Sequence, residues 1–198
     1  MRLKQLVEIR TGLSLERKRG ATYDDFYKKY KAITLKSFGN DIYLTSEYLD
    51  EFIAVEKLNP QYLTCVGDII VRLRSPNKAV FITDGYQGLI FPAFMSIIRI
   101  LDISKIDGEF LAYYLNSNLA HSKLANKANG TAIPMIKNSD LADLEIELPP
   151  IDRQKNIVQY IKLANQEINI LNELILEKTQ LKNKILETAI TKAKGLKQ

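Results

Sequence analysis

The clearest hydrophobic pattern lies in the C-terminal quarter of the chain. From Gln154 to about Lys194, apolar residues recur in alternating steps of four and three, which is the a/d seam of a heptad repeat. The seam contains Ile157, Ile161, Ala164, Ile168, Leu171 and Ile175, and then shifts to Leu181, Ile185 and Ala189. About 40 helical residues at ~1.5 Å each predict a rod of roughly 60 Å. The preceding part of the chain can cover only part of this stripe, so we expect a partner helix. A helix folded back on its own body is the alternative.

A shorter alternation precedes this helix. Apolar and acidic residues alternate over 144–148, the period-two pattern of a half-buried strand. Pro149-Pro150 ends that strand, and Asp152 is the expected N-cap of the helix. The pattern therefore divides the chain into a mixed body, residues 1–150, and a helical region, residues 151–198.

The body has the pattern of a mixed α/β fold with a substantial twisted sheet. Short apolar runs between turn residues predict strands at 32–35, 42–44, 69–73, 79–83 and 94–101. Helical spacing of apolar residues predicts one helix over 108–128. Together with the C-terminal pattern, the predicted fold is a twisted-sheet domain followed by a long coiled-coil helix.

Charge is distributed unevenly along the chain. The net charge is +5, but residues 1–150 hold 19 basic and 18 acidic residues, so the body is close to neutral. A nucleic-acid surface would therefore have to be a local basic patch. Two such patches exist: the stretch from Arg10 to Lys36, with eight basic and three acidic residues, and the cluster Arg72, Arg74 and Lys78.

Two segments within these patches have open interpretations. Tyrosines alternate with lysines between Tyr23 and Lys31, which predicts either an ordinary amphipathic element or a groove-facing patch that binds phosphates. The segment from Arg74 to Lys78 lies between two predicted strands. It is either a solvated turn or a recognition loop, since recognition groups are commonly placed on loops between rigid strands.

The sequence carries no recognisable catalytic motif. Asn59-Pro60-Gln61-Tyr62 is similar to the Asn-Pro-Pro-Tyr motif of adenine methyltransferases but departs at its third position, and no glycine-rich cofactor loop accompanies it. Glu16-Arg17-Lys18 has the spacing of a nuclease motif without a suitable upstream acid. His121 has no second histidine or nearby cysteine, so we expect a surface or capping residue and not a metal ligand. Since no motif for catalysis or cofactor binding is found, we expect no metal site, no cofactor and no enzymatic activity.

The cysteine content and the apolar runs of the sequence indicate the cellular compartment. Cys65 is the single cysteine and is flanked by apolar residues, so we expect a small core residue in a reducing cytoplasm. No apolar run is long enough for a membrane span, and the N-terminal residues lack the apolar core of a signal peptide.

The region around the helix start resembles a known family. A Gly-Thr-x-x-Pro loop, a strand ending in Leu-Pro-Pro and a Gln-x-x-Ile helix opening occur in this order, with matches at Gly130, Thr131, Pro134, Leu141, Leu144, Ile146, Leu148, Pro149, Pro150, Gln154 and Ile157. The segments Leu3–Gly12 and Gly67–Ile70 support the match, and Arg153 departs from it, since the family usually has an acid there. This order is similar to specificity (S) subunits of type I restriction-modification systems. Such subunits usually contain two target-recognition domains and two helical spacers, and this chain resembles one set, either a half-sized subunit or a half of a longer one.

The resemblance implies sequence-specific binding of double-stranded DNA, with chemistry left to other subunits. The implied partners are modification (methyltransferase) subunits, with a restriction subunit left open, and a second copy bound through the C-terminal helix. The expected DNA-binding residues are Arg17, Lys18, Arg19, Arg72, Arg74, Asn77, Lys78, Asn129 and Thr131. The expected dimerisation residues are Ile157, Ile161, Ile168, Leu171, Ile175, Leu181 and Ile185. The alternatives are a coiled-coil adaptor without DNA recognition and a DNA-modifying enzyme with an unrecognised site.

Overall fold

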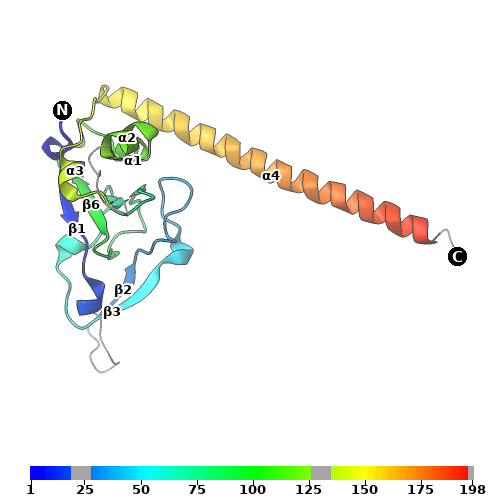
Figure 1. The fold of residues 1–198 in the computed structure, drawn as a ribbon, viewed down its shortest axis with the longest axis horizontal. Helices are drawn as coiled ribbons and strands as arrows, with labels where there is room; N and C mark the ends of the chain where they lie inside the picture. The colour runs from blue at the N-terminus through cyan, green and yellow to red at the C-terminus, as the bar shows by residue number, and fades with distance from the viewer. Residues whose placement is uncertain (19–27, 126–134, 196–198) are drawn as a thin grey trace. The chain divides into compact units, whose positions relative to one another are not determined.

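The computed structural model describes residues 1–18, 28–125 and 135–195, without the side chains of Arg17 and of residues 191–195. The chain forms two compact units, Met1–Lys155 and Asn156–Gln198. The first contains short strands and helices, and the second is part of one long helix (Figure 1). The predicted mixed α/β fold with a long C-terminal helix is therefore confirmed.

A four-stranded antiparallel sheet forms the centre of the first unit. Its strands run in the spatial order β1 (Val7–Thr11), β6 (Met95–Ile100), β4 (Ile69–Arg72) and β5 (Ala79–Phe81). In β4, Ile69 and Val71 pack into one buried cluster, whereas Ile70 packs into another. Because neighbouring strand residues point to opposite faces, both faces of the sheet are covered. This explains why β4 is a continuous apolar run.

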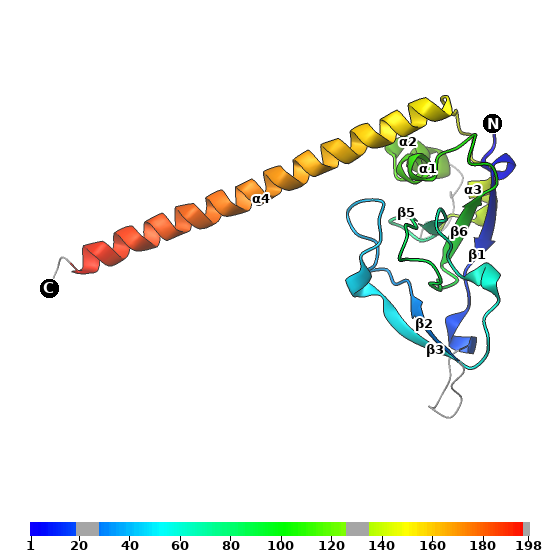
Figure 2. The same ribbon diagram turned by 180° about the vertical axis from the view of Figure 1, so that it is seen from behind.

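Three short helices contribute to the first of these clusters. They are α1 (Gly108–Leu115), α2 (Asn118–Ala125) and α3 (Asn138–Ala142), and α1 packs beside β5 (Figure 2). The prediction of a single helix over 108–128 is wrong, because the helix is interrupted after α1, at Asn116. The Asn116 side chain accepts from the Ala79 N–H and donates to the Ala79 carbonyl, both at 2.8 Å, which ties the helix end to the edge strand β5.

A separate two-stranded ribbon lies at the end of the unit away from α1 and α2 (Figures 1 and 2). It consists of β2 (Lys28–Ala32) and β3 (Asp50–Ala54), antiparallel, with Tyr30 opposite Phe52. These two side chains face a small buried cluster of their own. Short 3-10 helices complete the unit at Leu3–Gln5, Leu15–Lys18, Ser46–Tyr48 and Pro60–Tyr62.

Three predicted strands are absent from the described structure. Of the segment 32–35, only Ala32 belongs to a strand, as the last residue of β2, because a turn at 34–37 follows. The segment 42–44 forms only two isolated bridges, Phe38–Leu44 and Tyr43–Phe81. The segment 144–148 shows the predicted alternation of buried and exposed residues. Its backbone hydrogen-bond partners are Met1 and Leu3, at the start of the chain. This paired stretch is too short to form more than one bridge.

The long helix α4 runs from Ile151 to Gly195, 45 residues. It begins one residue before Asp152, so the predicted N-cap is wrong. The Pro150 carbonyl accepts from both Arg153 and Gln154, which starts the helix directly after the two prolines. Gln154 is fully buried and bonds the Asp107 N–H at 2.9 Å and the carbonyls of Lys105 and Pro149. This glutamine therefore fixes the first turn of α4 to the rest of its unit.

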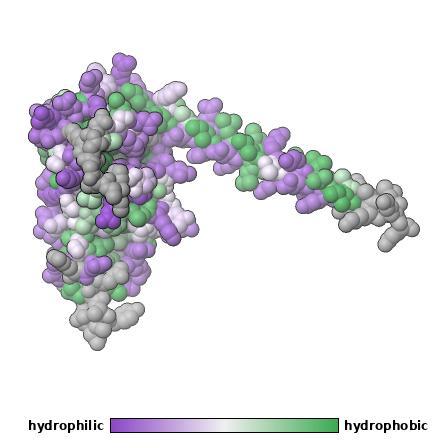
Figure 3. All heavy atoms as spheres, in the orientation of Figure 1, coloured by the Kyte–Doolittle hydropathy of each residue, from purple (hydrophilic) through white to green (hydrophobic). Residues whose placement is uncertain are grey.

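Past its first turns, α4 exposes a large amount of apolar side chain. Twelve leucine, isoleucine and tyrosine side chains from Tyr160 to Ile190 are at least 47% exposed, and they follow the helix in the space-filling view (Figure 3). In the described part of the chain, no helix is both long and apolar enough to cross a membrane.

Candidate nucleic-acid interface

The loop between β4 and β5, residues 73–78, is braced at several points. Leu73 is buried, and its N–H donates to the Phe94 carbonyl at 3.0 Å. The Asn77 side-chain amide donates to the carbonyls of Arg72 and Leu73 at 3.1 and 3.0 Å. Asn77 was predicted to contact DNA, but both of its donor bonds hold the loop together. Its amide therefore acts first as a structural support.

Lys78 and Arg72 are also largely engaged within the protein. The Lys78 ammonium donates to the Gly39 carbonyl. Burial lowers the pKa of Lys78, an effect opposed by Asp41 and reinforced by Arg72. The Arg72 guanidinium lies 5.8 Å from the centre of the Phe38 ring, and its Nε is buried with no hydrogen-bond acceptor among the described residues. Both side chains thus connect the β4–β5 loop to the segment 36–41.

Arg74 differs from its neighbours because it is exposed. Its backbone forms an isolated antiparallel bridge with Met135, and the adjacent Ile136 N–H donates to the Leu73 carbonyl at 2.8 Å. In the described structure no hydrogen bond or ion pair of the Arg74 side chain is seen. Its guanidinium is therefore presented to solvent from a braced loop.

The first residue of α3, Asn138, is bonded to the central sheet. The Asn138 side chain accepts from the Ser96 hydroxyl at 2.5 Å and donates to the Thr11 hydroxyl at 2.8 Å, which ties α3 to β6 and β1. Lys137, next to it, is exposed and was not among the predicted site residues. Asn129 and Thr131 lie outside the described residues.

The basic residues near the N-terminus belong to a different part of the unit. Lys18 forms an exposed ion pair with Glu56, and its carbonyl accepts from Val55, which places this turn beside the end of β3. The Arg17 side chain and Arg19 lie outside the description. The structure therefore groups Arg72, Arg74, Asn77 and Lys78 around one loop and places Lys18 at the ribbon.

The ribbon itself has a basic outer face. Lys29 and Lys31 point away from the buried face of Tyr30 and are both exposed. Lys29 lies 4.0 Å from the carboxylate of Glu51, which is opposite Lys31 in the ribbon, so this face has two lysines and one acid. Tyr30 is buried, so it packs in the core and does not offer a surface for stacking bases. The alternation of lysines and apolar residues in 28–32 was the available signal for this face.

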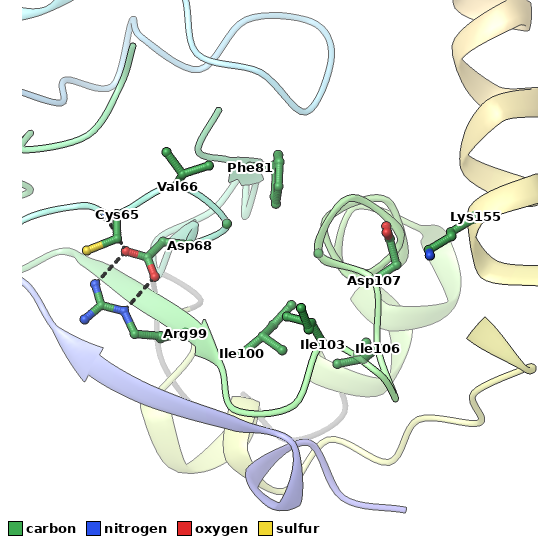
Figure 4. A pocket seen from close by; sticks show the side chains of 12 residues that line it. Cys65, Val66, Asp68, Phe81, Arg99, Ile100, Ile103, Ile106, Asp107 and Lys155 are labelled. Atoms are coloured by element: carbon green, nitrogen blue, oxygen red, sulfur yellow. Dashed lines mark hydrogen bonds and ion pairs between the residues drawn. The ribbon is translucent and has the colours of Figure 1, made fainter. Parts of the chain in front are cut away.

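A cavity of about 470 Å³ lies elsewhere in the first unit (Figure 4). Its walls are mainly apolar, with Val66, Phe81 and Ile103 among them, and none of the predicted DNA-binding residues lines it. Two of its charged groups are paired: Asp68 forms a two-point ion pair with Arg99, at 2.8 and 2.7 Å. The hydrogen bond to Asp68 raises the pKa of Arg99, whereas burial lowers it, and the net effect is a raised pKa.

Cys65 lines the same cavity and corrects a prediction. It is exposed, not a core residue, because the turn at 65–68 projects from the sheet, with Gly67 at a φ of +90°. In the described ranges no group of three or more histidine, cysteine or acidic side chains could hold a metal ion. His121, in α2, has a buried Nε2 without a partner among the described residues.

Comparison with known proteins gives matches over most of the chain. The family profile for the type I restriction modification DNA specificity domain matches residues 1–186. The chain is 29% identical over 203 aligned residues to the type I restriction enzyme MjaVIII specificity subunit of Methanocaldococcus jannaschii. That alignment covers 96% of this chain and 45% of the relative, so the chain spans about half the length of this curated protein.

Two solved structures share the fold. The HsdS subunit from Thermoanaerobacter tengcongensis superimposes with a TM-score of 0.66 at 19% identity, over 88% of this chain and 43% of that one. A chain from a structure on complex assembly and conformational transition of the type I R-M system gives 0.71 at 18% identity, over 96% and 47%. With the profile match over nearly the whole sequence, the chain belongs to the type I restriction modification DNA specificity domain family.

Proposed function

We propose that this chain selects the DNA target of a type I restriction-modification complex in the cytoplasm, without catalysing a reaction itself. In this proposal, the body binds double-stranded DNA, and modification subunits carry out methylation. The observation that carries the proposal is Arg74, an exposed guanidinium on a loop braced by Asn77 and Leu73. A rigidly supported arginine is suited to reading guanine, because its forked donors match the guanine O6 and N7.

Replacing Arg74 with alanine should weaken binding to the preferred DNA sequence by about 1–3 kcal/mol and relax the base preference at one position. The reason is that the lost hydrogen bonds are specific to one base pair. The measurement is selection of bound fragments from random DNA, with the modification subunit present. Arg2→Ala is a matched control, since Arg2 is exposed but pairs with Asp143. An unchanged selected sequence would contradict the assignment of Arg74.

The ribbon lysines should bind differently from Arg74. Replacing Lys29 and Lys31 with alanine should weaken binding to all sequences alike and reduce the slope of log affinity against log salt by about one to two. Phosphate contacts produce this pattern because they release counterions but carry no base information. Titrations at several salt concentrations measure it. Lys105→Ala, at an exposed lysine paired with Asp102, is the control. A change in base preference would assign the ribbon to base reading instead.

The proposal also includes dimerisation through α4. Of the seven predicted dimerisation residues, Ile157 and Ile161 are half-buried and the other five are 50–63% exposed. Two copies related by a two-fold axis can cover this stripe, because the same surface of each helix packs against the other. An antiparallel pair would hold the two bodies at opposite ends of a rod of roughly 70 Å, at ~1.5 Å per residue. The dimer would then recognise two inverted half-sites separated by a fixed spacer.

A second apolar stripe supports a further helical partner. It lies on the c and g positions of the heptad and contains Tyr160, Leu163, Ile170 and Leu174, which are all at least 47% exposed. Pairing through the a and d positions leaves the c positions and much of the g positions uncovered. We infer that a helix of the modification subunit packs on this second stripe, since contiguous exposed apolar surface marks protein contacts.

A further inference from the structure

Two lysines interrupt the a/d seam of α4. If the heptad frame of the first half is continued without the shift to Leu181, the a positions are 161, 168, 175, 182 and 189, and the d positions are 157, 164, 171, 178 and 185, and Leu181 falls at a g position beside the seam. Eight of these ten residues are isoleucine, leucine or alanine, and the two exceptions are Lys178 and Lys182. Both are exposed in the single chain. A charged residue in a seam weakens pairing but can determine register and partner choice.

The surface around these lysines has the form of a coiled-coil contact. A hollow on α4 is lined by Ile175, Lys178, Thr179 and Lys182, with Leu174 beside them. The first four occupy consecutive a, d, e and a positions, the set of four residues that surrounds one inserted side chain in knobs-into-holes packing. This hollow therefore has the residue arrangement that receives a side chain in a coiled coil.

We propose that Lys178 and Lys182 determine the antiparallel orientation and the register of a second copy of this chain on α4. The inference rests on the dimer of the proposed function and adds the residues that select one arrangement. Its basis is the set of neighbours that each lysine meets in the competing arrangements.

In an antiparallel pair, a positions of one helix face d positions of the other. The register that overlaps the whole seam places Ile161 opposite Ile185 of the second copy and Leu171 opposite Ile175. Lys178 then faces Ile168, the side chain that enters the hollow, and the neighbouring g residue is Glu167. The Glu167 carboxylate can pair with the Lys178 ammonium at the edge of the seam. Lys182 faces Ala164, whose small side chain leaves room for the lysine stem to reach solvent.

In a parallel pair, each seam residue would face its own copy. Lys178 would meet Lys178, and Lys182 would meet Lys182 one layer further, which gathers four ammonium groups within about one helical turn. The flanking e and g positions offer no acid there, since they are Leu174, Thr179, Leu181 and Leu186. Like charges without counter-charges disfavour this arrangement.

An antiparallel pair shifted by one heptad is also disfavoured. This shift places Lys178 and Lys182 opposite Ile161 and Ile157. The adjoining residues there include Tyr160 and Lys162 but no acid. The lysines would lose the Glu167 partner and the space beside Ala164. Of these three arrangements, the full-overlap register is the one that accommodates both lysines.

Disulfide trapping tests the orientation directly. In the full-length chain with Cys65→Ser, which removes the natural thiol, we introduce Ile161→Cys in one sample and Ile185→Cys in another. The two seam positions are 24 residues apart, roughly 36 Å along a helix at ~1.5 Å per residue. A mixture of the two variants should form the mixed 161–185 disulfide, and the Ile161→Cys sample alone should form almost none. A 161–161 disulfide in the otherwise unchanged chain would overturn the proposal.

Removing the lysines should release the constraint. In the Lys178→Ile, Lys182→Ile variant, self-disulfides of Ile161→Cys should rise by roughly tenfold, because the parallel pair is no longer penalised. The control Gln180→Ile, Lys184→Ile adds two isoleucines at exposed f and c positions and should leave the pattern unchanged. If the variant without both lysines still forms only the mixed 161–185 disulfide, the lysines do not determine the orientation. The dimer itself would still stand. A chain that sediments as a monomer before any substitution would instead refute the dimer of the proposed function, and this inference with it.

Discussion

Replacing Leu171 and Ile175 together with aspartate should convert the α4-mediated dimer into monomers. In the antiparallel register these two residues face each other near the two-fold axis, so four carboxylates would enter two central layers of the pair. Burying unpaired carboxylates costs several kcal/mol per ion, which exceeds what the remaining seam can supply. We expect the dimer dissociation constant to rise by at least about 1,000-fold, or ~4 kcal/mol. Sedimentation equilibrium across a concentration series measures this change.

Loss of the dimer should also change DNA binding. A monomer can occupy only one half-site, so affinity for the complete bipartite site should fall by about 100- to 10,000-fold, while half-site affinity is retained. The control Asn169→Asp, Asn183→Asp adds the same charge at exposed b positions outside the seam. A control variant that dissociates equally would show that added charge, not the seam, is responsible. A double-aspartate variant that remains dimeric would show that α4 is not the dimer interface.

Replacing Arg99 with methionine should strongly destabilise the body of the protein. Asp68 is 2% exposed and accepts two hydrogen bonds from the Arg99 guanidinium, so removing Arg99 leaves a buried carboxylate without its cation. Breaking one side of a buried ion pair typically costs about 3–5 kcal/mol. The remaining bond from the Cys65 N–H, at 2.6 Å, compensates only in part. Urea denaturation followed by circular dichroism measures the loss.

An exposed ion pair provides the comparison for Arg99. Lys105→Met removes a lysine that lies 3.0 Å from Asp102, with both side chains open to solvent, and should change stability by less than about 1 kcal/mol. A double variant, Arg99→Met with Asp68→Leu, should recover much of the lost stability because no unpaired charge remains. Equal effects of Arg99→Met and Lys105→Met would contradict the structural role of the Asp68–Arg99 pair.

Hydrogen bonds between distant residues decide the roles of several candidate DNA-binding residues. Lys78 was selected as a cation next to a loop, yet it donates to Gly39, 39 residues away. Asn77 was selected for its amide, yet its donors hold the loop carbonyls. Residue type and local spacing pointed to a loop that the structure braces, but they do not reveal which side chains are already engaged. Arg74 and the outward-facing lysines of β2 are the groups that the tertiary structure leaves exposed.

Local pattern was sufficient where the structure itself is local. The helix α4 was predicted nearly to its ends, because each of its hydrogen bonds joins residues four apart and its seam repeats along the chain. The strands β4 and β6 were predicted from apolar runs that reflect burial on both faces. The family resemblance likewise depended on motifs in sequential order, and the profile match over residues 1–186 confirmed it.

Tertiary contacts decided what local pattern could not. The segment 144–148 alternates like a strand, but its partners are at the opposite end of the chain, 145 residues away in the case of Met1 and Ile146. Cys65 has apolar neighbours in sequence, yet a turn places it at the surface. Thus the amino-acid sequence by itself determined the long helix, its seam and the family. The extent of strand pairing and the set of free cations depended on contacts between distant residues, since burial and hydrogen-bond partners arise only when the chain has folded.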